Sequence, residues 1–253
     1  MDTDIAVIGA GSAGAAAARA LVKEAAPTSW RLYGTGPIPA GVPATNYVRR
    51  PITSVLAMGA SFSLLQGNDI SDARVVIVAT GRERIPPLAG EKMLRGRGVS
   101  YCAACDGDLY RGKRIAAVIA DESLVHELDH LAARAEEVIV FASDSIALPS
   151  SVVRATAQVR EIVGDRAVEH ILLSDDSAEQ VSGVFMLKSE LAADVLMPGI
   201  ELDTDGAVVV GADLSTNLAG SFAAGSVTNA PGRDSEGEGV RAAHSALRLL
   251  ASR

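Results

Sequence analysis

Two cysteines, Cys102 and Cys105, are the residues of this 253-residue chain whose type and spacing point most directly to chemistry. They are its only cysteines, and two alanines separate them. Two intervening residues on a turn or a first helical turn bring the Cα atoms within reach of a disulfide, and a nearby helix N-terminus stabilises one thiolate. Asp106 follows directly and offers a carboxylate for the proton that thiol–disulfide exchange gains or loses. The pattern favours a reversible disulfide.

The same spacing also fits half of a zinc site or two small buried side chains. Zinc usually takes four ligands, and the spacing of the four histidines completes no such set; they are His126, His130, His170 and His244. His126 and His130 lie four residues apart and are expected on the surface of one helix. His244 lies on the last predicted helix, either near a bound cofactor or a neighbouring subunit, or as a half-exposed helix residue.

A glycine-rich segment near the N-terminus indicates a dinucleotide site. The apolar strand at 5–8 is followed by Gly9, Gly11 and Gly14 in the pattern G-x-G-x-x-G, and then by a helical run at 15–24. These glycines permit a tight turn and let backbone N–H groups approach a pyrophosphate at the helix N-terminus. The alternative is a strand-to-helix turn without a ligand. The strand before and the helix after favour the binding interpretation.

Composition and charge exclude several classes of protein. The chain is 48% hydrophobic and 4% aromatic, with a net charge of −8. A chain of this length and hydrophobic content can form the core of one large or two modest domains. No basic cluster suggests nucleic acid or an anionic membrane as a partner. We expect no signal peptide, and no apolar run reaches the roughly eighteen residues of a membrane-spanning helix. With no cysteines left for structural bridges, a reducing cytoplasm is the predicted location.

Three further segments complete an order of motifs along the chain. They are the strand at 75–78 that runs into Ala79-Thr80-Gly81, the stretch Gly98-Val99-Ser100-Tyr101 before the cysteines, and residues 214–227 with Phe222-Ala223-Ala224-Gly225. Together with the glycine-rich loop, this order resembles the low-molecular-weight thioredoxin reductases, which are FAD-dependent disulfide oxidoreductases. The resemblance covers most of the chain.

The resemblance implies an α/β fold of two Rossmann-like domains, the second inserted in the first and degenerate. An FAD-binding domain would comprise residues 1–87 plus 199–253, and the insert, 88–198, would carry the redox cysteine pair. Within the insert we expect strands at 114–119, 137–141 and 181–187 and a helix at 123–134. The last helix, 236–251, would direct its N-terminus toward the flavin. The family also implies a homodimer.

The same resemblance assigns roles to individual residues. Cys102, Cys105 and Asp106 would be catalytic, with Cys105 next to the flavin, Cys102 exchanging with the substrate and Asp106 moving the proton. The residues assigned to FAD are Gly9, Gly11, Ser12, Ala13, Gly14, Thr80, Gly81, Gly225, Ser226 and Val240. No metal is expected.

The insert departs from the family where NADPH should bind. After its first strand, in place of a second glycine-rich loop, the chain reads Ile119-Ala120-Asp121-Glu122. Side chains there fill the space of a pyrophosphate, and the carboxylates repel its charge. Residues 141–145 carry no basic cluster for a 2′-phosphate, and no glycine follows the strand at 185–187. The sequence therefore predicts that no nicotinamide nucleotide binds.

The FAD side is altered as well. The second strand, 30–33, ends at Gly34, where a carboxylate normally holds the adenosine ribose, and Ser226 stands where an aspartate is usual. Each lost group could weaken binding by about ten- to a hundredfold. The segment 35–66 is also shorter than in the family. FAD remains the expected cofactor.

These observations predict a dithiol oxidase. A small-molecule dithiol or a thioredoxin-like protein would pass electrons through Cys102 and Cys105 to FAD, and oxygen or another acceptor would reoxidise the flavin. The alternative runs the same path backwards, with ferredoxin or another one-electron carrier reducing the flavin and thioredoxin as the product. A third interpretation is a non-catalytic flavin-binding scaffold in which the cysteine pair is incidental.

Overall fold

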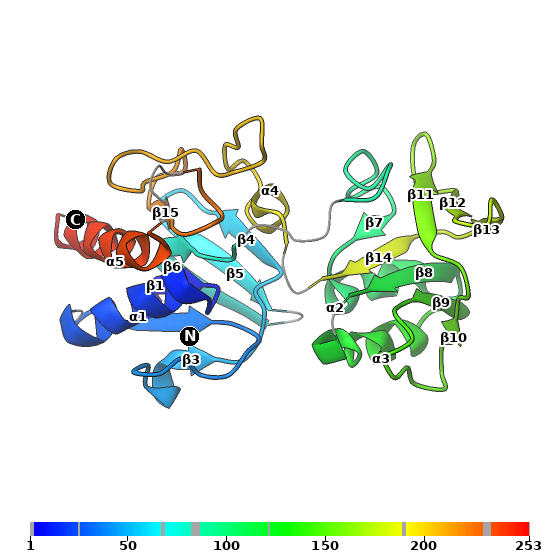
Figure 1. Cartoon of the computed structure of the whole chain (residues 1–253), viewed down its shortest axis with the longest axis horizontal. Helices are drawn as coiled ribbons and strands as arrows, with labels where there is room; N and C mark the ends of the chain where they lie inside the picture. Colours follow the sequence, from blue (N-terminus) through cyan, green and yellow to red (C-terminus); the bar gives the residue numbers. More distant parts are fainter. Residues whose placement is uncertain are drawn as a thin grey trace. The chain divides into compact units, whose positions relative to one another are not determined.

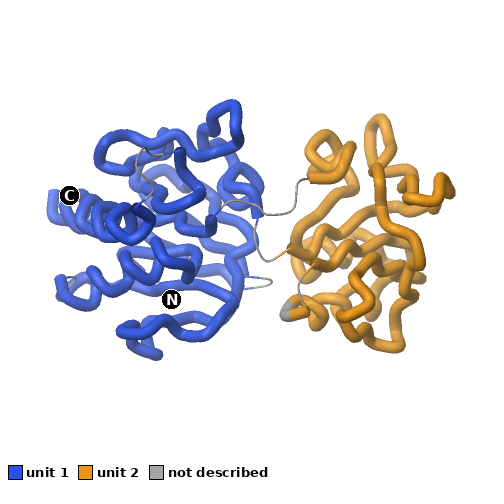
Figure 2. Tube along the Cα trace, viewed as in Figure 1, with its two compact units in different colours: residues 1–84, 190–253 blue, residues 85–189 orange. Residues whose placement is uncertain are grey.

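The computed structural model describes residues 3–24, 26–66, 69–81, 87–120, 122–188, 191–229 and 234–252. The chain divides into two compact units, and Figure 2 shows unit 1, residues 1–84 and 190–253, and unit 2, residues 85–189. Unit 2 thus interrupts unit 1 in the sequence. Residues 190–198, which the sequence-based division assigned to the insert, belong to unit 1. The binding of FAD by one of these units stays a prediction.

Unit 1 is built on a seven-stranded sheet in the order β3-β2-β1-β6-β5-β4, with β15 also paired to β6 (Figure 1). The strands are β1 Thr3–Ile8, β2 Trp30–Tyr33, β3 Tyr47–Val48, β4 Ser54–Ala57, β5 Phe62–Gln66, β6 Asp69–Val78 and β15 Ser221–Ala223. The strands β1, β2, β3, β6 and β15 run parallel. The hairpin of β4 and β5 joins the first half of β6 in antiparallel pairing, which makes β6 longer than the strand predicted at 75–78.

Two long helices of unit 1 pack side by side (Figure 1). The helices of this unit are α1 Ser12–Glu24, α4 Ala193–Leu196 and α5 Ser235–Ala251, with a 3-10 turn at Ala44–Asn46. Small buried side chains let α1 and α5 approach closely, among them Ala17, Ala18, Ala242, Ala243 and Ala246. Among the described helices of the chain, none is long and apolar enough to cross a membrane.

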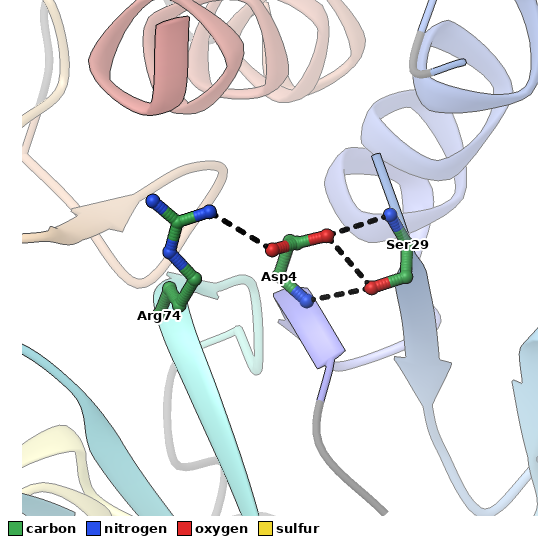
Figure 3. Close-up of polar contacts among 3 residues, drawn as sticks. All are labelled: Asp4, Ser29 and Arg74. Atoms are coloured by element: carbon green, nitrogen blue, oxygen red, sulfur yellow. Dashed lines mark hydrogen bonds and ion pairs between the residues drawn. The ribbon is translucent and has the colours of Figure 1, made fainter. Parts of the chain in front are cut away.

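Asp4 ties three neighbouring strands together at one end of this sheet (Figure 3). Its carboxylate accepts hydrogen bonds from the backbone N–H and the hydroxyl of Ser29, at 2.9 and 2.8 Å, and from Arg74 at 3.1 Å. Ser29 directly precedes β2, and Arg74 lies on β6. Burial by itself would raise the pKa of Asp4, but these hydrogen bonds outweigh it and lower the pKa. The ionised carboxylate therefore stabilises this end of the sheet, where β1, β2 and β6 lie side by side.

Unit 2 contains a five-stranded parallel sheet in the order β10-β9-β8-β14-β7 and an antiparallel sheet in the order β11-β12-β13. Its strands are β7 Val99–Ser100, β8 Arg114–Ile119, β9 Glu137–Phe141, β10 Val153–Arg154, β11 Val159–Val163, β12 His170–Leu173, β13 Ala178–Gln180 and β14 Val184–Leu187. Its helices are α2 Ala103–Asp106 and α3 Glu127–Ala132, with 3-10 turns at Gly107–Tyr110 and Glu122–Leu124.

The strands predicted at 114–119 and 137–141 are confirmed, and two other predictions need correction. The helix predicted at 123–134 is split, because the N–H groups of Val125 and Leu128 donate to carbonyls three residues back and so form tighter turns. The strand predicted from residue 181 begins only at Val184. Before it, Gly183 lies against the ring of Tyr110, where a Cβ would come within 2.3 Å of a ring atom. The α/β fold class with parallel sheets is as expected.

Candidate functional site

Cys102 and Cys105 form a disulfide with Cα atoms 5.3 Å apart, which confirms the reach inferred from their spacing. Cys102 is the N-cap of α2, and its Sγ accepts the backbone N–H of Cys105 at 3.1 Å. Ala103, 1% exposed, anchors the helix in the core of unit 2. An N–H aimed at Sγ stabilises a thiolate there once the bond is reduced. This contact supports the exchanging role predicted for Cys102.

Ser100 holds Asp106 beside the disulfide. The Ser100 hydroxyl donates to Oδ2 of Asp106 at 2.7 Å and accepts the backbone N–H of Cys102 at 3.2 Å. Ser100 is only 5% exposed, so the hydroxyl is sheltered from water. The charge of Asp106 adds to the effect of burial in raising the pKa of Tyr110. Sequence reasoning gave Ser100 no role, although its position on a strand two residues before Cys102 was a usable signal.

A second carboxylate near the pair, Asp108, is held by other partners. Arg134 donates to it at 2.9 Å and Arg111 at 2.6 Å. Hydrogen bonding from Arg134 is the largest effect on this group and, with Arg111, lowers the pKa of Asp108 against a smaller opposing effect of burial. The Asp108 carboxylate is therefore hydrogen-bonded to two arginines on the surface of unit 2. The role of Asp106 in proton transfer at the cysteines stays a prediction.

In unit 1 the glycine-rich loop forms a cradle where β1 and β6 end. Gly9 has a φ of +105°, and a Cβ on it would lie 2.3 Å from the carbonyl oxygen of Ala79. A Cβ on Gly14 would lie 1.8 Å from the carbonyl oxygen of Gly9. By contrast, Gly11 faces open space, and both Gly11 and Ser12 are exposed. The loop is thus closed against the sheet and open at the N-terminus of α1, as a bound pyrophosphate requires.

The residues assigned to the other side of the cradle lie next to it. Thr80 has a buried hydroxyl that makes no hydrogen bond within the described part of the chain. Gly81 approaches Ser226, since a Cβ on Gly81 would lie 3.5 Å from the Ser226 hydroxyl, and Ser226 is exposed. A buried hydroxyl without a protein partner, beside an open glycine-rich loop, fits a ligand with polar groups. The residues present therefore fit a dinucleotide such as FAD.

Glu238 is a functional candidate that sequence reasoning missed. It is 3% exposed on α5, and its carboxylate accepts the N–H of Gly225 at 2.7 Å and the hydroxyl of Thr228 at 3.4 Å. The Gly225 amide is thus engaged inside the protein, and the contribution of Gly225 is steric: its φ is +84°, and a Cβ would lie 2.7 Å from that of Ala13. Val240 is half-buried and packs against the core. An acidic residue flanked by glycines in a helix was the available signal.

No family profile matches the chain, whereas relatives and solved structures do. The thioredoxin reductase of Treponema pallidum is 30% identical over 224 residues, which cover 79% of this chain and 72% of the relative. A solved ferredoxin-flavin thioredoxin reductase from Clostridium acetobutylicum is 30% identical with a TM-score of 0.87, over 100% of this chain and 99% of that one. The chain belongs to the thioredoxin reductase family. Members of this family are FAD-binding thiol–disulfide oxidoreductases, so the predicted family, cofactor class and type of enzyme are confirmed.

A longer relative of this thioredoxin reductase-like chain shares only part of its length. One subunit of the alkyl hydroperoxide reductase of Pseudomonas putida is 32% identical over 206 residues, which cover 72% of this chain. The chain spans 40% of that relative.

Gly34 is tightly packed at the position where the thioredoxin reductase family has a carboxylate for the adenosine ribose. A Cβ on Gly34 would lie 2.6 Å from that of Ala10 and 3.0 Å from the hydroxyl of Tyr47. The Tyr47 hydroxyl itself donates to the carbonyl of Gly36 at 2.7 Å. Packing thus excludes any larger side chain at residue 34. The chain therefore lacks the carboxylate that binds the ribose, and its backbone also leaves no room for one at this position.

Two of the histidines, His244 and His126, each lie beside a glutamate. His244 lies 3.1 Å from Glu24, the last residue of α1. The glycine-rich loop is at the other end of that helix, about 18 Å away at 1.5 Å per residue. The cofactor-side position considered for His244 is therefore not supported. His126 pairs with Glu127 at 3.5 Å, and the described residues hold no group of three metal-binding side chains.

The nucleotide motifs that this thioredoxin reductase-like chain lacks in sequence are replaced by other local structure. A 3-10 helix at Glu122–Leu124 follows β8 in the sequence, and Asp121 lies outside the described residues. After β9, the hydroxyls of Ser143 and Ser145 bond to each other at 2.8 Å, and Arg154 donates to the carbonyl of Ser143 at 3.1 Å. This guanidinium is therefore engaged with backbone carbonyls at the end of the strand.

Proposed function

We propose that this protein is a flavin-dependent disulfide reductase that receives electrons from a ferredoxin-type carrier and passes them to a thioredoxin-like protein. One observation carries the proposal: the chain matches a ferredoxin-flavin thioredoxin reductase over its whole length. The sequence after β8, from Ile119 to Glu122, supports it because it lacks the glycines with which a loop binds the pyrophosphate of a nicotinamide nucleotide. This is the alternative weighed from the sequence, and it replaces the dithiol oxidase as the preferred function.

Residues of unit 1 would hold the FAD. Gly11 and Ser12 at the N-terminus of α1 are exposed residues whose amides would bind the pyrophosphate. The buried Thr80 hydroxyl and the hydroxyl of the exposed Ser226 would offer further polar contacts. FAD, when bound, supplies a centre that links one-electron carriers to the two-electron chemistry of a disulfide.

The exchange steps fall to residues of unit 2. In the reduced pair, the Cys102 thiolate attacks one sulfur of the substrate disulfide and releases the other as a thiolate. Asp106, held by the Ser100 hydroxyl, delivers a proton to that leaving group. Cys105 then attacks the Cys102 sulfur, releases the second substrate thiol and re-forms the disulfide. Each cycle gives the substrate two electrons and two protons, so two one-electron deliveries and two protons from solvent restore the reduced pair and Asp106.

The test is an anaerobic assay with the flavin-loaded protein and a thioredoxin as substrate. We expect new thioredoxin thiols with reduced ferredoxin and none with NADPH or NADH, and Cys102→Ser should abolish the reaction. Thiol formation with NADPH at the rate seen with ferredoxin would overturn the proposal.

Two controls separate the other candidates. In air with dithiothreitol alone, rapid formation of hydrogen peroxide would favour the dithiol oxidase, in which one dithiol and one oxygen give a disulfide and peroxide. A protein that binds FAD but shows no thiol–disulfide exchange at Cys102 and Cys105 in either assay would favour the scaffold. The homodimer and the cytoplasmic location stay predictions of the sequence.

A further inference from the structure

A buried ion pair in unit 2 takes no part in the exchange steps. Nζ of Lys188 lies 2.9 Å from Oε1 and 3.3 Å from Oε2 of Glu91, and the two side chains are 5% and 1% exposed. The residues are 97 positions apart in the sequence. Burying two charges is costly, and such a pair persists only when further hydrogen bonds satisfy it. The stability of this pair therefore depends on the further hydrogen bonds that its charged groups make.

The Glu91 carboxylate is satisfied on both oxygens. The Tyr101 hydroxyl donates to Oε1 at 2.9 Å, and the backbone N–H of Leu88 donates to Oε2 at 2.8 Å. Each oxygen thus accepts from Lys188 and from one other donor. A carboxylate held in this way has little freedom to move, and it fixes the hydroxyl of the residue that directly precedes Cys102.

The chain that leads into the disulfide is held from two sides. The Ser100 hydroxyl contacts the backbone of Cys102 and the carboxylate of Asp106. Tyr101, the next residue, packs against the core that contains Leu94 and Val99, and its hydroxyl reaches Glu91. The two hydroxyls share no hydrogen-bond partner among these contacts, so the segment is held at two separate points.

We propose that Glu91 and Lys188 are positioning residues of the redox site. Through the Tyr101 hydroxyl they fix the backbone before Cys102 and thereby set the equilibrium between the disulfide and the dithiol. A backbone already held near the geometry of the disulfide loses less freedom when the bond forms, so the network favours the oxidised pair. The proposal rests on the redox role proposed for the cysteines and not on the identity of the electron donor.

The experiment measures this equilibrium in the full-length protein. The protein is equilibrated with mixtures of reduced and oxidised dithiothreitol, so that protein disulfide plus dithiol gives protein dithiol plus cyclic disulfide, with two electrons and two protons transferred. Free thiols are then trapped with a maleimide and counted. Because the chain has two cysteines in all, the count reports Cys102 and Cys105 alone.

Tyr101→Phe is the deciding variant, because it removes one hydroxyl and leaves the ion pair in place. We expect the equilibrium to shift about five- to tenfold toward the dithiol. A hydrogen bond to a charged group can contribute roughly tenfold or more, and we expect a part of that contribution to appear in this equilibrium. Lys188→Arg, which keeps the charge, should stay near the wild type. Lys188→Met should shift the equilibrium in the same direction as Tyr101→Phe, provided that it folds.

Ile171→Val is the matched control, since Ile171 is 0% exposed in the same unit and makes none of these hydrogen bonds. It should lower stability while leaving the equilibrium within about twofold of the wild type. The proposal fails if Tyr101→Phe stays within that range, or if Ile171→Val shifts the equilibrium as much. A lack of ferredoxin-dependent activity would not change these thiol counts, so the two failures are distinguishable.

Discussion

Replacing Ser100 with alanine removes one hydroxyl from the centre of the candidate redox site. The hydroxyl donates to Asp106 at 2.7 Å and accepts the N–H of Cys102 at 3.2 Å, so both contacts are lost together. With Ser100 only 5% exposed, water cannot readily take the place of the hydroxyl. We expect the Asp106 carboxylate to lose its fixed position beside the cysteines.

The size of the effect follows from these contacts. A hydrogen bond to a charged group contributes about 1.5–3 kcal/mol, which corresponds to roughly ten- to a hundredfold in rate when the bond positions a reacting group. General acid–base catalysis as a whole contributes about a hundred- to ten-thousandfold. Ser100→Ala should therefore slow thiol–disulfide exchange by about ten- to a hundredfold, less than Asp106→Asn.

The assay is a single turnover in which the pre-reduced protein is mixed with thioredoxin disulfide, because this isolates exchange from flavin reduction. If Ser100 acts through Asp106, the double variant should be no slower than Asp106→Asn alone. Ser100→Thr, which keeps the hydroxyl, is the control. A Ser100→Ala rate within about twofold of the wild type, or fully additive losses in the double variant, would refute the reasoning.

Three further predictions concern the cysteine pair, the glycine-rich loop and Asp4 of the unit 1 sheet. Cys105→Ser should trap a mixed disulfide between Cys102 and thioredoxin on a non-reducing gel, and Cys102→Ser should trap none; the reverse result would exchange their roles. Gly11→Ala should keep the melting temperature of the flavin-free protein but weaken FAD binding in a fluorescence titration, whereas Gly14→Ala, whose Cβ would meet backbone at 1.8 Å, should lower the melting temperature itself. Because the folded-state pKa of Asp4 is lowered, its stabilisation is present above the ordinary value of 3.8 and is lost as pH falls through the folded pKa. Asp4→Asn should thus cost at most about 1 kcal/mol at neutral pH in urea unfolding, and this difference should vanish in acid; a constant difference would contradict the assignment.

Several features of this protein could be predicted from local patterns in the sequence. The disulfide between Cys102 and Cys105 follows from their spacing, and the short apolar runs at 114–119 and 137–141 become strands at those bounds. Other contacts join residues far apart in the chain and could not be predicted in this way. The pairing of Glu91 with Lys188 depends on tertiary packing across 97 positions and leaves no periodic signal.

The direction of electron flow could not be read from the motifs either. Attack of Cys102 on a disulfide and attack of a substrate thiolate on Cys102 are the same exchange step run in opposite directions. The motifs around the cysteine pair therefore fit a dithiol oxidase and a disulfide reductase equally. The preference for the reductase came from the full-length match to a ferredoxin-flavin thioredoxin reductase.

The most direct test of the central claim is the reduction of the bound flavin itself. Under anaerobic conditions, the visible absorption band of the flavin-loaded protein is followed after the addition of NADPH, then NADH, then reduced ferredoxin. The account predicts that the band persists with both nicotinamide nucleotides and is lost rapidly with ferredoxin. Rapid loss of the band with NADPH would contradict it.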